Sequence, residues 1–243
     1  MSAAKKAIIE QLQQELLLLH GFKPPSNTTV QMGLGALEKA FPNAVFPTGA
    51  IHEFLSDAVE HTAATGGFVA GLLGHLMQRG GACIWISATR TLFPPALKAF
   101  GVIPDQVVFV DLQREKDVLW ATEEALKCEG LAAVVAELKD ISFTASRRLQ
   151  LATEQSRVTG FLLRHQPRDL NAIACVARWR ITPLASMADN GMPGVGFPRW
   201  QVGLVKVRNG KPGAWQVEWA ANRFRVITEN TALPNPVRIR KIG

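Results

Sequence analysis

The sequence predicts an α/β fold: a mostly parallel β-sheet flanked by helices, with an N-terminal helix, a C-terminal β-hairpin and a basic tail. Short apolar runs alternate with helix-like segments from about residue 48 to residue 181. These runs are continuously apolar, as is typical of parallel strands covered on both faces. Apolar and polar residues then alternate on either side of Asn209-Gly210, which predicts a hairpin. With 243 residues, 47% of them hydrophobic, the chain is long enough for one large core.

The first part of the chain is expected to be a helix and a linker. Residues 4–19 form an amphipathic helix, which Pro24 and Pro25 end, and a loop-rich linker runs to about Pro47. The expected core elements then follow in this order: strand 51–55, helix 67–79, strand 83–87, short helix 95–100, strand 107–110, helix 115–128, strand 131–136, helix 144–157, strand 160–163 and strand 173–181. In helix 144–157, Thr144 is expected to cap the first turn, and Leu149, Leu151 and Ala152 supply apolar positions.

The pattern changes after Pro183. Residues 183–198 are rich in Gly, Pro, Asn and Asp and read as a long loop, which is usually functional or disordered at such a length. The hairpin strands are expected at 200–207 and 214–219, and the last dozen residues are expected to be extended or disordered. The chain therefore divides into an N-terminal helix and linker (1–47), a core (48–220) and a basic C-terminal tail (221–243).

Charge is unevenly distributed along the chain. The net charge is +7. From Arg199 onward the chain contains nine Lys or Arg residues and only two Asp or Glu residues, so the whole excess of positive charge lies in this part. Such asymmetry indicates a polyanion or an acidic protein as partner; the alternative is a solvated basic tail without a specific partner. No apolar run approaches the length of a membrane helix and no signal peptide precedes the core, so we expect a cytoplasmic protein that does not interact with membranes.

Neither the cysteines nor the histidines form a recognisable metal or catalytic motif. Cys83, Cys128 and Cys175 are far apart and lack a CxxC pattern, which is typical of reduced core cysteines. The five histidines show no HExxH or similar spacing. We therefore expect no metal site.

One segment has the order of elements of a phosphate-binding domain without its chemistry. The strand GAIHEFL (49–55), a loop, a helix and the strand ACIWIS (82–87) follow the order of a P-loop domain. A working P-loop ends in Gly-Lys-Ser/Thr, whose lysine and hydroxyl bind phosphate and metal. The expected loop reads SDAVEHTAATGGFVAG and contains Gly66 and Gly67 but no lysine. The order of elements therefore suggests an NTPase, whereas the residues argue against one.

Several longer segments carry a family resemblance. From about Thr48 to Trp219 the order and spacing resemble the core of RecA-type recombinases, including ACIWISATRTLFPPALKAFGVIPDQVVFVDLQ and the Walker-B-like strand LAAVVAEL. The chain resembles the ImuA family more closely still, in DVLWATEEALKC, FTASRRLQLATEQSRVTGFLLR and RWQVGLVKVRNGKPGAWQVEW. The most specific parts are TASRRLQLA and PRW…RNGKPG…W.

The resemblance implies a function. Proteins of the ImuA family are accessories of error-prone (translesion) DNA synthesis after DNA damage, in the SOS response. They work beside ImuB, a polymerase-like protein, and an error-prone replicative-type polymerase. RecA and single-stranded DNA are further candidate partners. The family is also similar to SulA, so one alternative is an inhibitor of cell division. A divergent DNA-stimulated ATPase is the second alternative.

The resemblance also places a vestigial nucleotide site on this sequence. Gly66 and Gly67 fall in the expected phosphate loop, Thr89 stands where RecA-type proteins have the water-activating Glu, and Glu137 holds the Walker B position. RecA-type catalysis needs the phosphate-binding lysine and that Glu together. We therefore expect a non-catalytic adaptor without a cofactor, in which Glu137 pairs with neighbouring groups.

Basic residues in the C-terminal part are candidates for DNA or partner binding. They are Arg178, Arg180, Arg199, Lys206, Arg208, Lys211, Arg223, Arg225, Arg238, Arg240 and Lys241. Trp200, Trp215 and Trp219 interleave with them, either as a stacking platform for single strands or as core residues. The loop at 183–198 has no Lys or Arg and offers only Phe197 and backbone amides to a nucleic acid. Arg147 and Arg148 could contact a partner, although for at least one a solvated face is expected.

Overall fold

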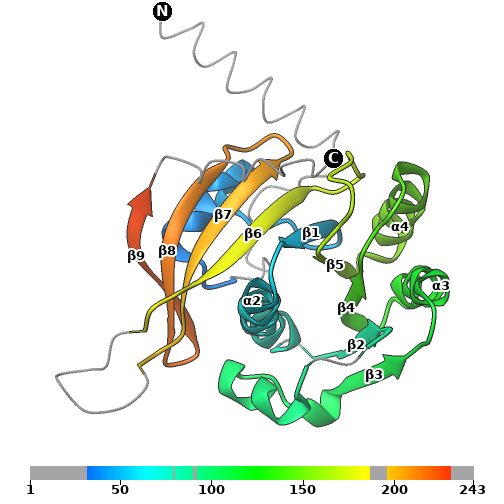
Figure 1. The fold of residues 1–243 in the computed structure, drawn as a ribbon, viewed down its shortest axis with the longest axis horizontal. Coiled ribbons are helices and arrows are strands. Elements are labelled where there is room, and N and C mark those ends of the chain that lie inside the picture. The colour runs from blue at the N-terminus through cyan, green and yellow to red at the C-terminus, as the bar shows by residue number, and fades with distance from the viewer. Residues whose placement is uncertain (1–31, 79, 90–91, 187–195, 231–243) are drawn as a thin grey trace, which may run out of the picture.

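A computed structural model describes residues 32–78, 80–89, 92–186 and 196–230. In these residues the chain forms one nine-stranded sheet in the order β3-β2-β4-β5-β1-β6-β7-β8-β9 (Figure 1). The strands are β1 (Ile51–Ser56), β2 (Ala82–Ser87), β3 (Val107–Asp111), β4 (Leu131–Leu138), β5 (Thr159–His165), β6 (Ala177–Leu184), β7 (Arg199–Val207), β8 (Gly213–Ala220) and β9 (Arg223–Asn230). The helices are α2 (Val59–Met77), α3 (Glu115–Leu126) and α4 (Phe143–Ser156), with 3₁₀ turns η1 (Gly35–Ala40), η2 (Pro42–Ala44), η3 (Pro94–Phe100) and η4 (Pro104–Gln106).

The sheet has a parallel part and an antiparallel part. Strands β1 to β6 are all paired in parallel, and β1 lies in the middle between β5 and β6. Strands β6 to β9 are paired in antiparallel, as short connections between neighbours allow. This confirms the predicted α/β class with its mostly parallel sheet and C-terminal hairpin.

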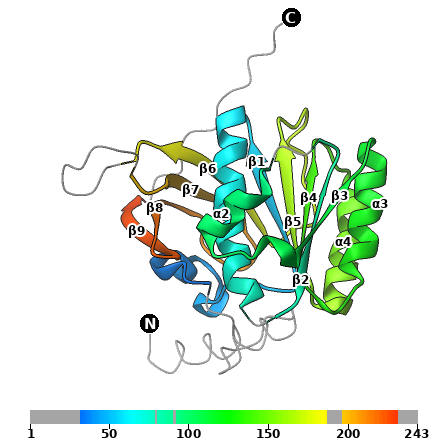
Figure 2. The same cartoon turned by 90° about the horizontal axis from the view of Figure 1, so that it is seen from below.

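Helices cover both faces of the parallel part. Helix α2 lies within the curve of the sheet, whereas α3 and α4 pack on the outer side (Figures 1 and 2). The larger core lies on the α2 side and is aromatic: Trp179 stacks on Phe54 with ring centroids 5.8 Å apart, and Phe68 contacts both rings. A smaller aliphatic core, which includes the fully buried Leu149, lies under α3 and α4.

Helix α2 begins eight residues earlier than the sequence indicated, at Val59 rather than Gly67. The polar stretch read as a phosphate loop is the first half of this helix, where its Ala and Glu residues have good helix propensity. The glycines farther along α2 serve packing. A Cβ on Gly67 would lie 3.1 Å from the Phe100 ring, and one on Gly74 would lie 2.4 Å from the Phe100 carbonyl oxygen. Glycine here lets η3 approach the helix closely.

Both ends of the core extend beyond the expected segments. Before β1, Met32, Leu37 and Phe46 are buried in the larger core, so this part of the expected linker is packed. After β8, the expected tail begins with β9, whose Phe224 is buried in the same core. Residues 4–19, most of the 183–198 loop and the C-terminal residues from 231 onward lie outside the described residues.

Two smaller differences concern β6 and α4. Strand β6 begins at Ala177 rather than at residue 173. The cap of α4 is Ser142, whose Oγ accepts a hydrogen bond from the Ala145 amide at 3.1 Å, rather than Thr144. Leu149 is buried as expected, but Leu151 is 45% exposed. Among the described residues, no helix combines the length and apolar character needed to span a membrane.

Candidate functional site

The place expected for a phosphate loop is a tight turn. Strand β1 ends at Ser56 and α2 begins at Val59, so only Asp57 and Ala58 connect them. A P-loop needs a longer glycine-rich connection, whose backbone amides surround the phosphates. Ala58 gives α2 no side-chain cap, and Glu60 adds a carboxylate to the first turn. Gly66 and Gly67 lie in the body of α2, away from this connection.

The remaining acid of the vestigial site has partners inside the protein. Glu137 is buried at the carboxyl end of β4 and accepts a hydrogen bond from Trp85 Nε1 at 2.7 Å. Its other oxygen lies 3.5 Å from His165 Nε2, and His165 Nδ1 is hydrogen-bonded to Thr62 Oγ1 of α2 at 3.2 Å. Thr89 is exposed just after β2. The ring of His165 therefore lies between Glu137 and the start of α2, hydrogen-bonded to Thr62 on one side and in contact with Glu137 on the other. Gly66, Gly67 and Thr89 take no part in these contacts.

A second polar cluster is buried in the middle of the sheet. Glu53 of β1 and Arg164 of β5 have fully buried side chains, and Glu53 Oε1 lies 2.8 Å from Arg164 Nη1. The other Glu53 oxygen is paired with Arg178 of β6. Cys175 lies beside Glu53, and burial raises the pKa of its thiol to about 12, with the Glu53 charge contributing. A buried charge is tolerable only when it is paired in this way.

The two arginines of this cluster also hold loops. Arg164 donates from Nε to the Lys139 carbonyl at 3.1 Å and from Nη2 to the Asp169 carbonyl at 2.8 Å. Arg178 donates from Nη2 to the carbonyl of Asn171 at 2.7 Å. Arg178 is a binding residue in the sequence-based prediction, which does not include Glu53 or Arg164. The only available signal was a single charged residue within each of two apolar strands.

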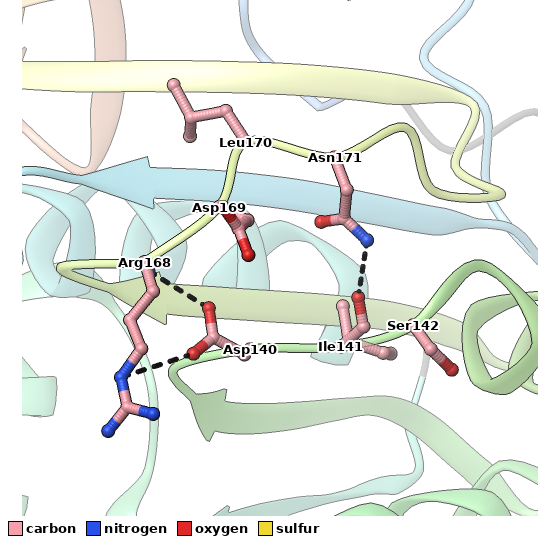
Figure 3. A pocket seen from close by; sticks show the side chains of 7 residues that line it. All are labelled: Asp140, Ile141, Ser142, Arg168, Asp169, Leu170 and Asn171. Atoms are coloured by element: carbon pink, nitrogen blue, oxygen red, sulfur yellow. Dashed lines mark hydrogen bonds and ion pairs between the residues drawn. The ribbon is translucent and has the colours of Figure 1, made fainter. Parts of the chain in front are cut away.

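The loops held by Arg164 border a hollow of about 700 Å³ at the carboxyl ends of β4 and β5 (Figure 3). Its lining residues are Asp140, Ile141, Ser142, Arg168, Asp169, Leu170 and Asn171. Several of their polar groups already bond across the hollow: Asp140 accepts from the Arg168 amide at 3.0 Å, and Asn171 donates to the Ile141 carbonyl at 2.8 Å. These bonds mainly fasten the two loops to each other.

The predicted cationic residues fall into two groups. Arg178, Arg180 and Arg199 are partly buried in ion pairs, with Arg180 3.2 Å from Asp57 and Arg199 2.6 Å from Glu218. The second group is exposed and forms no ion pair with any other described residue; it consists of Lys206, Arg208, Lys211, Arg223 and Arg225. Arg238, Arg240 and Lys241 lie outside the described residues. Of the described cations, the second group is therefore the better placed to contact a partner.

The three interleaving tryptophans belong to the core. Trp200, Trp215 and Trp219 are each 4% exposed, and the Trp219 indole donates to the Ala99 carbonyl at 2.9 Å. They point to the α2 side because alternate residues of a strand face opposite sides of a sheet. The stacking platform is therefore wrong for these residues, and the core alternative is right. Phe197 is 46% exposed.

The cysteines partly follow expectation. Cys83 and Cys175 are buried, and burial alone raises the pKa of the Cys83 thiol to about 12. Cys128 is exposed just after α3, which corrects the expectation of a core residue. No group of three or more His, Cys, Asp or Glu side chains in the described ranges could hold a metal ion.

Comparison with known proteins identifies relatives. No protein-family model matches the chain. The chain is similar to Protein ImuA from two strains of Caulobacter vibrioides, each 34% identical over 198 residues. The aligned region covers 76% of this chain and 81% of each relative, which spans most of both proteins. The chain therefore belongs to the ImuA family.

Proposed function

We propose that this protein is a non-catalytic adaptor in error-prone DNA synthesis after DNA damage. It works beside an ImuB-like, polymerase-like protein and, through it, an error-prone replicative-type polymerase. Membership of the ImuA family supports a role in the ImuA/ImuB system of damage-induced mutagenesis. The non-catalytic part of the proposal rests mainly on one observation, the two-residue connection between β1 and α2.

That connection argues against nucleotide hydrolysis on steric and electrostatic grounds. Asp57 and Ala58 are too few to form a ring of backbone amides around a triphosphate. The acids nearby, Asp57 and Glu60, would repel phosphate charge. The β1–α2 connection and α2 itself contain no lysine, and Glu137 is already engaged by Trp85. Losing both phosphate ligation and the water-activating acid leaves the transition state of phosphoryl transfer without its main stabilising groups.

Steady-state phosphate release tests the non-catalytic proposal. We expect no ATP turnover above background, with or without single-stranded DNA. A RecA-type recombinase under the same conditions is the positive control. Turnover that disappears in Glu137→Ala would overturn the proposal and favour the divergent-ATPase alternative.

The partner-binding part of the proposal concerns the basic C-terminal region. Strands β7, β8 and β9 place most of the stretch from Arg199 to Asn230 in the sheet, so the tail of this proposal is residues 231–243. Truncation after Leu233 keeps the whole of β9 and should leave the fold intact. It should weaken both partner binding and damage-induced mutagenesis. The triple variant Arg238→Gln/Arg240→Gln/Lys241→Gln should reproduce part of this loss.

A pull-down from damaged cells, identifying polymerases and division proteins together, tests which system the protein serves. Recovery of an ImuB-like protein that is reduced by the truncation is the expected result. A truncated protein that binds partners and supports mutagenesis at full strength would rule out the role of the tail. Recovery of a tubulin-like division protein in place of polymerases would favour the SulA-like alternative.

A further inference from the structure

A second hollow lies between α4 and the start of the antiparallel part of the sheet. Its volume is about 380 Å³. Three of its lining residues come from α4, three from the segment before β6, and two from the end of β7 and the turn after it; they are Phe143, Arg147, Gln150, Ile173, Ala174, Cys175, Lys206 and Arg208. We call this hollow the α4–β7 groove. None of its lining residues belongs to the vestigial nucleotide site.

The rim of the α4–β7 groove is cationic. Arg147, Lys206 and Arg208 line it, and no carboxylate does. Lys206 and Arg208 are exposed and form no ion pair with another described residue. Arg147 donates to Gln150 Oε1 at 2.8 Å and lies 4.0 Å from Glu154 Oε1, both on its own helix, whereas the neighbouring Arg148 is held by Glu123 of α3 at 2.7 Å. The two arginines therefore differ: Arg148 is paired across to α3, whereas Arg147 is held within α4 at the edge of the groove.

The floor of the groove is apolar. Ile173, Ala174 and Cys175 are buried and form it, while Phe143 stands at its edge with 58% of its surface exposed. A large exposed aromatic ring beside an apolar hollow is typical of a surface that another apolar side chain covers. The combination of such a floor with a cationic rim selects for a ligand that is apolar in the middle and negatively charged on both sides.

We propose that the α4–β7 groove docks a protein segment in which one large apolar side chain is flanked by Asp or Glu residues. The inference rests on the adaptor function proposed above and gives it a binding site. The chain's own C-terminal tail does not fit, because residues 231–243 contain Arg238, Arg240 and Lys241 and no acid. A nucleic acid fits less well, because its phosphates would use the rim and leave the apolar floor unfilled.

Short fluorescent peptides with the full-length protein test this proposal. The probe is a peptide of Asp and Glu with one central Phe, and its partner peptide carries Ser in place of Phe. We expect the Phe peptide to bind more tightly than the Ser peptide. Lys206→Glu and Arg208→Glu should each lower the affinity of the protein for the Phe peptide roughly fivefold, as expected for the loss of a charge pair at a partly exposed site.

The matched control is Lys116→Glu, which makes the same charge change at an exposed position of α3. It should leave peptide affinity unchanged. Equal binding by Lys206→Glu and Lys116→Glu, or equal affinity for the Phe and Ser peptides, would overturn the proposal. A third outcome would also overturn it: the peptides fail to bind, and a labelled oligothymidine strand binds the groove variants more weakly than the wild-type protein. The occupant of the groove would then be nucleic acid.

Damage-induced mutation frequency separates this proposal from the proposed function. The double variant Lys206→Glu/Arg208→Glu should lower it, and Lys116→Glu should not. Full mutagenesis in the double variant overturns the groove as a docking site but leaves the adaptor function standing. Unchanged mutagenesis after deletion of the whole gene overturns the adaptor function itself.

Discussion

The two sides of the sheet are stabilised by different chemistry. On the α2 side, aromatic rings such as Trp179, Phe54 and Phe68 pack against one another, and the polar His52 is buried among them. On the α3/α4 side, an aliphatic core adjoins the buried charges of Glu53 and Arg164. Apolar packing is non-directional, whereas the charged cluster fixes particular loops. The α2 side therefore provides bulk stability, whereas the other side holds the loops around Lys139, Asp169 and Asn171 in place.

The buried charged cluster should give the largest effect. In Glu53→Gln, the fully buried Arg164 loses its carboxylate, and we expect a loss of about 3–5 kcal/mol in the free energy of unfolding. The matched control is Arg148→Gln, which breaks the surface pair with Glu123 and should cost about 0–1 kcal/mol. Urea denaturation measures both. Similar losses in the two variants would show that burial does not distinguish the two ion pairs.

A charge placed in the aliphatic core should have a comparable effect. Leu149 of α4 is fully buried, so Leu149→Asp should destabilise the protein by about 3–5 kcal/mol, the order for an unpaired buried charge. Leu151 lies on the same helix but is 45% exposed, and Leu151→Asp should change stability by no more than about 0.5 kcal/mol. Thermal denaturation distinguishes them. An unchanged melting temperature in Leu149→Asp would contradict the burial of α4 in this core.

The aromatic side should be sensitive to acid through His52. Burial lowers the pKa of His52 to about 4, against 6.5 for the unperturbed group, although its Nε2 is hydrogen-bonded to the Pro47 carbonyl. Below pH 6.5 the His52 side chain therefore binds a proton in the unfolded chain. In the folded protein it binds this proton only near pH 4. Stability from this group is present above pH 6.5 and is lost as the pH falls to about 4, by about 3 kcal/mol in total.

Chemical denaturation at several pH values measures this loss. His52→Gln removes the titrating group and should flatten the pH dependence in that window, although the variant is less stable overall. Burial, aided by the charge of Arg223, also lowers the pKa of His75, so a smaller slope of the same sign should persist. Equal slopes in the wild-type protein and His52→Gln would contradict the assignment.

The smallest expected change in stability comes from two glycines of α2, one that is closely packed and one that is not. In Gly74→Ala the new Cβ would lie 2.4 Å from the Phe100 carbonyl oxygen, and we expect a loss of about 1–3 kcal/mol. Apart from the backbone of the helix itself, no atom lies within 4 Å of the corresponding position on Gly66, so Gly66→Ala should stabilise the helix by up to about 1 kcal/mol. Thermal melts compare the two. Destabilisation by Gly66→Ala would indicate a role beyond the helix.

The sequence allowed most of the fold to be predicted because its apolar runs are short, continuous and regularly spaced. The start of α2 was missed because a polar stretch before Gly66 and Gly67 resembled a loop, although nothing in it prevents a helix. Strand β9 was missed because charged residues, among them Arg223 and Arg225, hide the buried Phe224. The Glu53–Arg164 pair could not be predicted, since the contact exists only because the strand order places β1 beside β5.

The site was harder to predict than the fold. Glu137 could be placed at a strand end, but its partners Trp85 and His165 come from two other strands. The cations from Arg178 to Arg225 could be identified from the sequence. Which of them are paired and which are exposed depends on carboxylates that the fold brings next to them, such as Glu218 beside Arg199. The sequence pattern of the tryptophans in β7 and β8 fits both a core position and a stacking platform. The position of α2, which covers them, decides for the core.

The central position of β1 has a consequence for synthesis on the ribosome. Glu53 and its partner Arg164 are separated by 111 positions in the chain, and both sheet neighbours of β1 are translated long after it. A nascent chain that has not reached β5 and β6 therefore exposes both edges of an apolar strand, the usual template for aggregation. The protein should thus depend on protection of this strand by chaperones until the last third of translation.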